Sequence, residues 1–176
     1  MKRQWIIFFR IFTTLFCVVV VGWIFSHSLQ TGVESAEQSS SIVEMLQKIA
    51  RKIAPNGWIA NATGEAYDKL HAIVRNIAHW TEYALLGASF AFCYVSWTQK
   101  KIFLTLPILG IAIVPIVDEC LQLFTAGRGA QVSDVLVDVF GGVCGLFFVI
   151  GVLWLTYKIS YRKRNRQGGA YGARKS

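Results

Sequence analysis

Four stretches of this sequence, each about 20 residues long, are apolar enough to cross the hydrocarbon core of a bilayer. They cover approximately residues 5–25, 77–97, 102–124 and 135–157. Hydrophobic residues make up 54% of the 176 residues, more than a soluble domain usually contains. The sequence therefore predicts an all-α fold: a polytopic membrane bundle of four transmembrane helices, forming a single domain over residues 1–176.

Lysine and arginine residues predict how these helices are oriented. They gather before the first stretch or at its start, between the second and third, and after the fourth: Lys2, Arg3, Arg10, Lys100, Lys101, Lys158, Arg162, Lys163, Arg164 and Arg166. Because basic residues accumulate on the cytoplasmic side, we expect a multi-pass protein of the bacterial cell membrane with both termini cytoplasmic, an outward loop at residues 26–76 and a basic cytoplasmic tail at residues 158–176. The net charge of +8 then indicates contact with membrane lipids, and no nucleic-acid partner is expected.

The outward loop contains a short amphipathic helix. Ser41 and Glu44 have the spacing of a capping box. Apolar residues then recur along one helical face: Ile42, Leu46, Ile49 and Ile53. The polar side carries Lys48, Arg51 and Lys52. We expect this helix either to lie on the outer leaflet or to cover the bundle.

Polar and ionisable residues interrupt three of the four apolar stretches. At about 100° per residue, those within each stretch share one side of its helix. The second stretch carries His79, Glu82 and Tyr83, and the third carries Asp118, Glu119 and Gln122. Asp134 and Asp138 lie at the start of the fourth stretch, and Arg128 lies between the third and fourth stretches. Gly141 and Gly145 continue the line of the two aspartates, as expected for helix packing or for contact with a second copy of the chain.

The expected topology places these polar residues near the outer ends of their helices. The third helix runs outward, so Asp118 lies roughly 9 Å below its end at a rise of ~1.5 Å per residue. The fourth helix runs back inward after Arg128. Ionisable groups at membrane depth usually line a cavity or pair with one another. We therefore expect three helices to converge on one polar pocket that opens outward.

The charges within this cluster leave three alternatives open. Five carboxylates face only Arg128 and His79, so ion pairing alone leaves negative charge over. The cluster could be a purely structural network, a pocket for an anionic or amphiphilic envelope molecule, or part of a metal-dependent enzyme that acts on a phosphorylated or glycosylated lipid. In the last case a divalent cation would lie at Asp118, Glu119, Asp134 and Asp138. The spacing matches no familiar metallohydrolase signature, so the sequence identifies no catalytic residue.

Three blocks of the sequence resemble the VanZ-like family of small bacterial membrane proteins. The first is Phe25, Ser26, His27 and Ser28; the second is His79 with Tyr83, Ala84, Leu85, Leu86 and Gly87; the third is Asp118, Glu119, Gln122, Phe124, Arg128, Asp134, Gly141 and Gly145. The family pattern commonly has asparagine where this chain has Asp138, so the chain carries an additional carboxylate there.

The resemblance implies a role in the cell envelope. The family is named for an accessory factor that lowers susceptibility to the glycopeptide teicoplanin without the altered peptidoglycan precursors of the main resistance pathway. The resemblance therefore implies the family's association with antibiotic resistance. The expected partner is a cell-wall precursor or a lipoglycopeptide.

Overall fold

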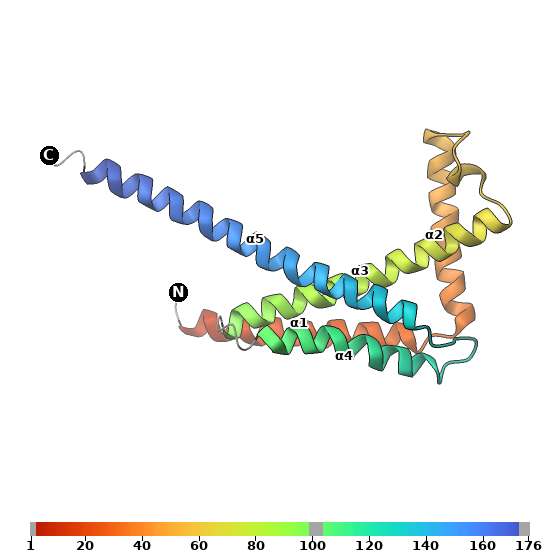
Figure 1. Cartoon of the computed structure of the whole chain (residues 1–176), viewed down its shortest axis with the longest axis horizontal. Coiled ribbons are helices and arrows are strands. Elements are labelled where there is room, and N and C mark those ends of the chain that lie inside the picture. Colours follow the sequence, from red (N-terminus) through yellow and green to blue (C-terminus); the bar gives the residue numbers. More distant parts are fainter. Residues whose placement is uncertain (1–2, 99–103, 173–176) are drawn as a thin grey trace.

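The computed structural model describes residues 3–98 and 104–172, with side chains described as far as residue 165. This part of the chain contains helices and no strand, which confirms the all-α expectation. In chain order the elements are α1 (Arg3–Ser28), α2 (Gly32–Ile53), the 3₁₀ helix η1 (Ile59–Asn61), α3 (Glu65–Trp97), α4 (Thr105–Gln122) and α5 (Val132–Gly172) (Figure 1).

Three of the described helices are long and apolar enough to cross a membrane: Arg3–Ser28, Thr105–Gln122 and Val132–Asn165. They correspond to the first, third and fourth predicted spans. The second predicted span, residues 77–97, lies within α3, which is less apolar because it carries ionisable side chains. The chain is thus a helical membrane protein with three clear spanning candidates. Lys2, Lys100, Lys101 and the first residues of the third predicted span lie outside the described residues.

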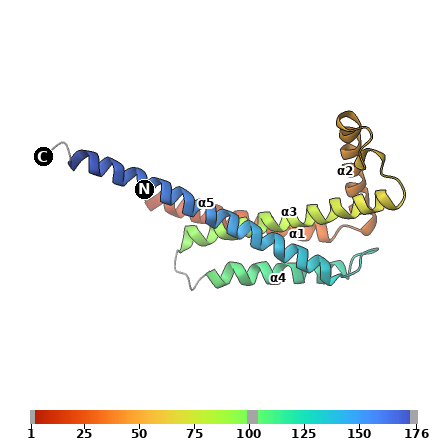
Figure 2. The same ribbon diagram turned by 45° about the horizontal axis from the view of Figure 1, so that its top comes forward.

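Helices α1, α4 and α5 pack around α3. It makes its most extensive contact with α5, which crosses it obliquely, while α1 and α4 lie alongside (Figures 1 and 2). One apolar core cluster joins α1 to α3 through Val20, Ile24, Tyr83 and Leu86. A second joins α3, α4 and α5 through Ala91, Ile111, Leu146 and Val149. These two clusters hold α1, α3, α4 and α5 together, and the polar residues lie at one end of the bundle that these helices form.

Glycines allow the α3 and α5 backbones to touch. A Cβ atom at Gly141 would lie 2.5 Å from the carbonyl oxygen of Trp80, and one at Gly145 would overlap the carbonyl oxygen of Ala84. Gly87 on α3 makes the reciprocal approach to the carbonyl of Gly142. Small residues at helical spacing permit such close helix packing in membranes. The line of small residues on α5 thus lies against α3.

Helix α2 begins earlier than the sequence suggested. Its capping box is formed by Thr31 and Glu34, not by Ser41 and Glu44. The backbone N–H of Thr31 donates to Oε2 of Glu34 at 2.8 Å, and the backbone N–H of Glu34 donates to Oγ1 of Thr31 at 3.3 Å. Ser41 instead bonds to the carbonyl of Glu37, as a serine inside a helix does. The prediction was wrong because both Thr31 with Glu34 and Ser41 with Glu44 have the spacing of a capping box, and the helix begins at the first pair.

Helix α2 packs against η1 and α3 through a face other than its predicted apolar face, which was expected either to lie on the outer leaflet or to cover the bundle. Ser39, Val43 and Gln47 are buried against η1 and the start of α3, and Nε2 of Gln47 donates to the carbonyl of Ala62 at 2.9 Å. Of the predicted apolar face, Ile42, Ile49 and Ile53 are exposed, and Leu46 is partly buried against the cluster around Val43. A buried amide that finds a backbone partner is tolerated in an interface, so a polar residue could take a position that hydropathy assigns to an apolar one.

Replacing Thr31 with alanine should destabilise the first turn of α2. The threonine hydroxyl satisfies one orphan N–H of the helix start, and loss of such a cap costs about 1 kcal/mol. The hydrogen bonds from Thr31 also lower the pKa of Glu34. The stabilisation from Glu34 is therefore present above its ordinary pKa and lost as the pH falls through the lowered value. Hydrogen exchange of residues 32–36 should accelerate in the Thr31→Ala variant, whereas Ser41→Ala should leave it unchanged.

Candidate functional site

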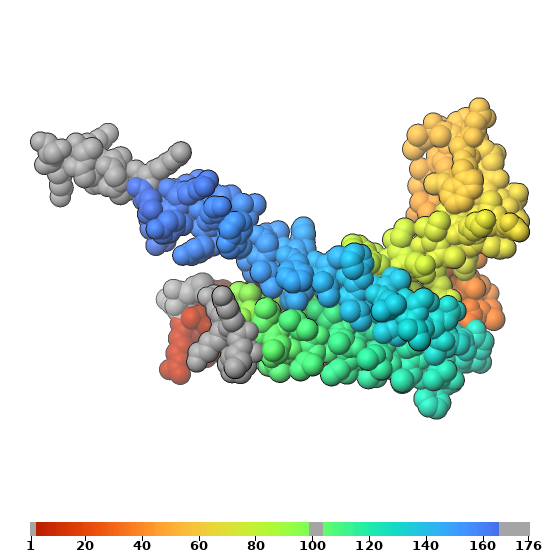
Figure 3. Space-filling view, viewed as in Figure 1, coloured from red at the N-terminus to blue at the C-terminus, as the bar shows by residue number. Residues whose placement is uncertain are grey.

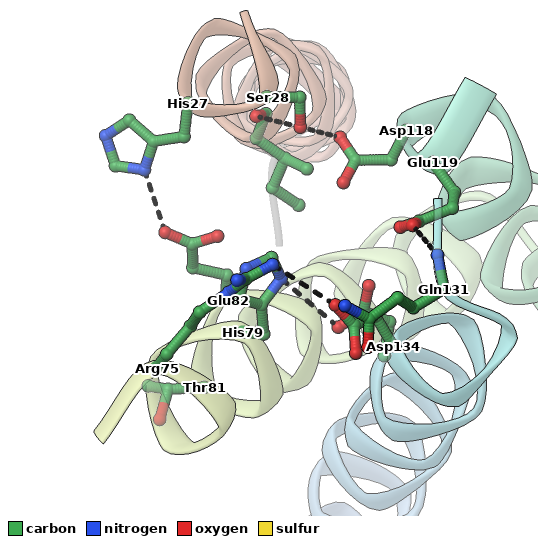
Figure 4. A network of polar contacts seen from close by, with 12 residues as sticks. His27, Ser28, Arg75, His79, Thr81, Glu82, Asp118, Glu119, Gln131 and Asp134 are labelled. Carbon is green, nitrogen blue, oxygen red and sulfur yellow. Dashed lines mark hydrogen bonds and ion pairs between the residues drawn. The ribbon is translucent and has the colours of Figure 1, made fainter. Parts of the chain in front are cut away.

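The predicted polar residues come together at one end of the bundle, where α1 ends, α4 ends and α5 begins. Figure 4 shows side chains from these three helices and from α3 around a common space. Within it Asp118, Gln122 and Asp138 are fully or almost fully buried, as is Tyr83. Burying polar groups away from water costs free energy unless they form hydrogen bonds or ion pairs with one another. Among the described residues, three ion pairs and several hydrogen bonds link these side chains, and some buried polar atoms have no hydrogen-bond partner.

Three ion pairs link the helices. Nδ1 of His27 lies 2.8 Å from Oε1 of Glu82, which joins α1 to α3. The Arg75 guanidinium lies 3.3 Å from Oδ2 of Asp134, and Nδ1 of His79 lies 3.6 Å from Oδ1 of Asp138. The last two pairs join α3 to α5. Each pair that contains a histidine is ionic only while its imidazole is protonated.

Hydrogen bonds anchor the two carboxylates of α4. The Ser28 hydroxyl donates to Oδ1 of Asp118, and Nε2 of Gln122 donates to Oδ2 of the same residue at 3.3 Å. The backbone N–H of Gln131 donates to Oε1 of Glu119. Asp118 thus fixes the end of α1 against α4, and Glu119 fixes the chain that leads into α5.

Several buried polar atoms have no hydrogen-bond partner within the described residues. They include the Tyr83 hydroxyl, Oε2 of Glu119, Oε1 of Gln122 and Oδ2 of Asp138. An unpaired buried acceptor costs about 1–3 kcal/mol, more when it is charged. Water molecules, protons or a ligand could each satisfy these atoms.

Two adjoining cavities open beside this network. The larger, of about 170 Å³, lies between α2, α3 and the loop that joins α4 to α5. The smaller, of about 80 Å³, reaches inward to His27, His79 and Glu82. Three residues line both cavities: Ser35, Arg75 and Arg128. The larger cavity is also bordered by Gly32, Gly127 and Gly129; the backbones of Gly32 and Gly127 are in close contact, and a Cβ atom at Gly32 would overlap the carbonyl oxygen of Gly127.

Arg128 is half-buried between these cavities. No carboxylate of the described residues lies within ion-pairing distance of its guanidinium. Burial lowers the pKa of Arg128, and the nearby charge of Arg75 lowers it further, against the opposing effect of Asp118, Glu119 and Glu82. Arginine remains protonated at neutral pH despite such shifts. The cavity wall therefore carries two positive charges, one of which is uncompensated by a direct partner.

The sequence located most of this cluster and missed part of it. His79, Glu82, Tyr83, Asp118, Glu119, Gln122, Asp134 and Asp138 all lie within it. Arg75, Ser35 and Gln131 were not predicted, and His27 and Ser28 were found only through the family resemblance. A signal for Arg75 existed, because His71, Arg75 and His79 are spaced four residues apart and so share one face of α3. Arg75 was missed because the second predicted span begins at residue 77.

Within residues 3–98 and 104–172, no three histidine, cysteine, aspartate or glutamate side chains are placed to hold a metal ion together. Asp118, Glu119 and Asp138 are nevertheless close enough to influence one another electrostatically. A metal at these carboxylates stays a prediction.

The model of one protein family matches most of the chain. The match to VanZ/LLP1 extends over residues 12–155, which includes all of the clustered side chains described above. This chain belongs to the VanZ family. No curated protein and no solved structure matches it. Family membership together with the apolar helices identifies a VanZ-like membrane protein, and the cluster at the end of its bundle lies inside the family domain.

Proposed function

We propose that this VanZ-like protein binds the anionic headgroup of an amphiphilic envelope molecule in the two cavities beside Arg75 and Arg128. Arg128 carries the proposal: it is half-buried, lines both cavities and has no acidic partner among the described residues. A buried cation without a counterion is unfavourable, and a bound phosphate, pyrophosphate or carboxylate would supply the missing charge. A planar guanidinium can hold such a group through two parallel hydrogen bonds.

The carboxylates below the arginines have a positioning role in this proposal. Asp134 accepts a hydrogen bond from Arg75 and directs that side chain toward the larger cavity wall. Asp118 ties α1 to α4 by accepting a hydrogen bond from Ser28, and Gln122 on the same helix donates to its other oxygen. An anion in the larger cavity would meet the two arginines and no carboxylate of the described residues, whereas Glu82 lines the smaller cavity.

We further propose that the cavities face outward and that binding contributes to tolerance of teicoplanin. The basic residues at both ends of the chain support this orientation under the positive-inside rule. Teicoplanin carries an acyl chain, and a polar pocket at the level of the outer leaflet could intercept an amphiphile that anchors there. A lipid-linked cell-wall precursor has the same combination of an anionic headgroup and an apolar chain.

Asp118→Asn tests the proposed function in cells. Asparagine keeps one oxygen acceptor, which serves Ser28 or Gln122 but not both in their present geometry, and it removes the negative charge, so the contact between Ser28 and α4 beside the smaller cavity is weakened. In a teicoplanin-sensitive bacterium, the wild-type protein should raise the inhibitory concentration of teicoplanin, and the variant should not. Membrane levels of both proteins should be equal. Loss of the variant from the membrane would favour a purely structural cluster, and equal tolerance would contradict the proposal.

A metal-dependent enzyme acting on a phosphorylated or glycosylated lipid is the second candidate. The unpaired oxygens of Glu119 and Asp138 favour it, because carboxylate oxygens are the ligands that hard divalent cations prefer. With a cation bound there, Arg128 could hold the substrate phosphate. Purified protein incubated with a lipid pyrophosphate and magnesium, manganese or calcium should then release phosphate. No release with any of the three cations would reject this candidate and leave the binding function intact.

A further inference from the structure

Helix α2 presents an exposed apolar stripe that no part of the described chain covers. The stripe consists of Ile42, Met45, Ile49 and Ile53, which are between 41% and 79% exposed. These residues recur at the spacing of a single helical face. The buried face at Ser39, Val43 and Gln47 is a different one, already occupied by η1 and α3. Helix α2 is therefore apolar on a second side.

Helix α2 lies at the end of the bundle, where a bilayer around the spanning helices would end (Figure 1). Helix α2 lies across the end of the bundle, roughly perpendicular to α1 and α4, and projects beyond it as an arm (Figures 1 and 3). The loop that contains η1 lies on the side of α2 that faces away from the spanning helices (Figures 1 and 2). The side of α2 that faces back along the spanning helices is thus left open. A bilayer that contains α1 and α4 would meet the arm on that side.

The cations of α2 fit this placement. Lys48 and Lys52 are exposed and, at about 100° per residue, lie beside the stripe and away from the buried face. Arg51 is held closer to η1, because its Nε donates to the carbonyl of Ala60 at 3.1 Å. An apolar face bordered by lysines is the arrangement of helices that lie in the interface of a membrane. Lysine side chains there extend their charged ends to the headgroups.

We propose that α2 inserts its Ile42–Ile53 stripe into the outer leaflet and rests on the membrane as an in-plane helix. The occupant of the stripe is a lipid surface with anionic headgroups. This proposal rests on the burial pattern and placement of α2 and goes beyond headgroup binding at Arg128. It has one consequence for that pocket: α2 supplies Ser35 and Ile42 to the cavity walls, so the cavities would lie at headgroup depth. An amphiphile could then enter sideways from the leaflet with its chain still in the lipid.

A fluorescent probe on α2 tests the inserted stripe. An environment-sensitive nitrobenzoxadiazole label is attached at Ile49→Cys and, as the matched control, at the exposed polar position Glu44→Cys. Both variants also carry alanine in place of Cys17, Cys93, Cys120 and Cys144, so that only the introduced thiol reacts. The labelled proteins are placed in nanodiscs of phosphatidylcholine and phosphatidylglycerol, with and without lipids that carry a nitroxide near the top of the acyl chain.

The proposal expects blue-shifted emission from the label at position 49 and quenching by the nitroxide lipid several-fold stronger than at position 44. Equal emission and quenching at the two positions would overturn it. A blue shift at position 49 without nitroxide quenching would also overturn it, because the stripe would then be covered by a second copy or another protein. Circular dichroism of the cysteine-free parent verifies that the helices are intact.

Discussion

Replacing Gly145 with leucine should prevent stable packing of α3 against α5. A Cβ atom at this position already overlaps the carbonyl oxygen of Ala84, and that oxygen belongs to a helix backbone that cannot move aside alone. The two helices would have to separate, which would open the adjacent contacts at Gly87 and Gly141. Overpacking of a well-packed core costs about 1–3 kcal/mol and occasionally more, and we expect a value at or above the top of this range.

Gly151→Leu is the matched control for this substitution. Gly151 lies on the same helix, and a Cβ atom there meets nothing within 4 Å. In a detergent unfolding assay, Gly145→Leu should unfold at a markedly lower temperature than the wild type, while Gly151→Leu should match it. Similar behaviour of the two variants would mean that the close approach of α3 and α5 does not hold the bundle together.

Arg128→Gln should remove most of the affinity for an anionic headgroup. Glutamine keeps a polar side chain, but it is shorter than arginine and lacks the positive charge and the paired donors of a guanidinium. A hydrogen bond to a charged group contributes about 1.5–3 kcal/mol, which corresponds to roughly ten- to hundred-fold weaker binding. Because Arg128 has no ion-pair partner among the described residues, its removal should leave the thermal stability of the free protein nearly unchanged.

Thermal shift with farnesyl pyrophosphate checks this prediction. The ligand should raise the melting temperature of the wild type and have a much smaller effect on Arg128→Gln. Lys69→Gln is the control, since it removes the same charge from an exposed position of α3 outside both cavities. A shift that is the same in all three proteins would exclude Arg128 as the anion-binding residue. A large loss of stability in ligand-free Arg128→Gln would indicate a structural role.

The sequence predicted the helical fold and most of the cluster because both depend on strong signals. Long apolar stretches have few alternatives to membrane helices, and ionisable residues such as Asp118 and Glu119 are conspicuous within them. Helical spacing then sufficed to place them on one side of α4. The resemblance to the VanZ family drew attention to His27 and Ser28 at the end of α1, but only the structure places them in the cluster.

The remaining errors arose where tertiary contacts decide between equivalent local patterns. On α2 the exposed Ile42 face agrees with one of the two predicted alternatives, but helical spacing did not single out the Val43 face, which is buried by contact with η1 and α3. Thr31 and Ser41 both begin a capping-box pattern, and the chain uses the first. Arg75 lies outside the apolar window on α3, so hydropathy did not draw attention to it although its guanidinium meets Asp134.

The most direct test of anion binding at the end of the bundle is a calorimetric titration of the purified wild-type protein with farnesyl pyrophosphate and with farnesol. The two ligands share one apolar chain and differ in the charged headgroup. If Arg75 and Arg128 hold an anion, the pyrophosphate should bind with saturation at one site per chain, and its affinity should fall as salt is added, because added ions screen the charges. Farnesol should bind weakly or not at all. Equal binding of the two ligands, or no binding of either, would contradict the account and leave the polar cluster as a device that holds the helices together.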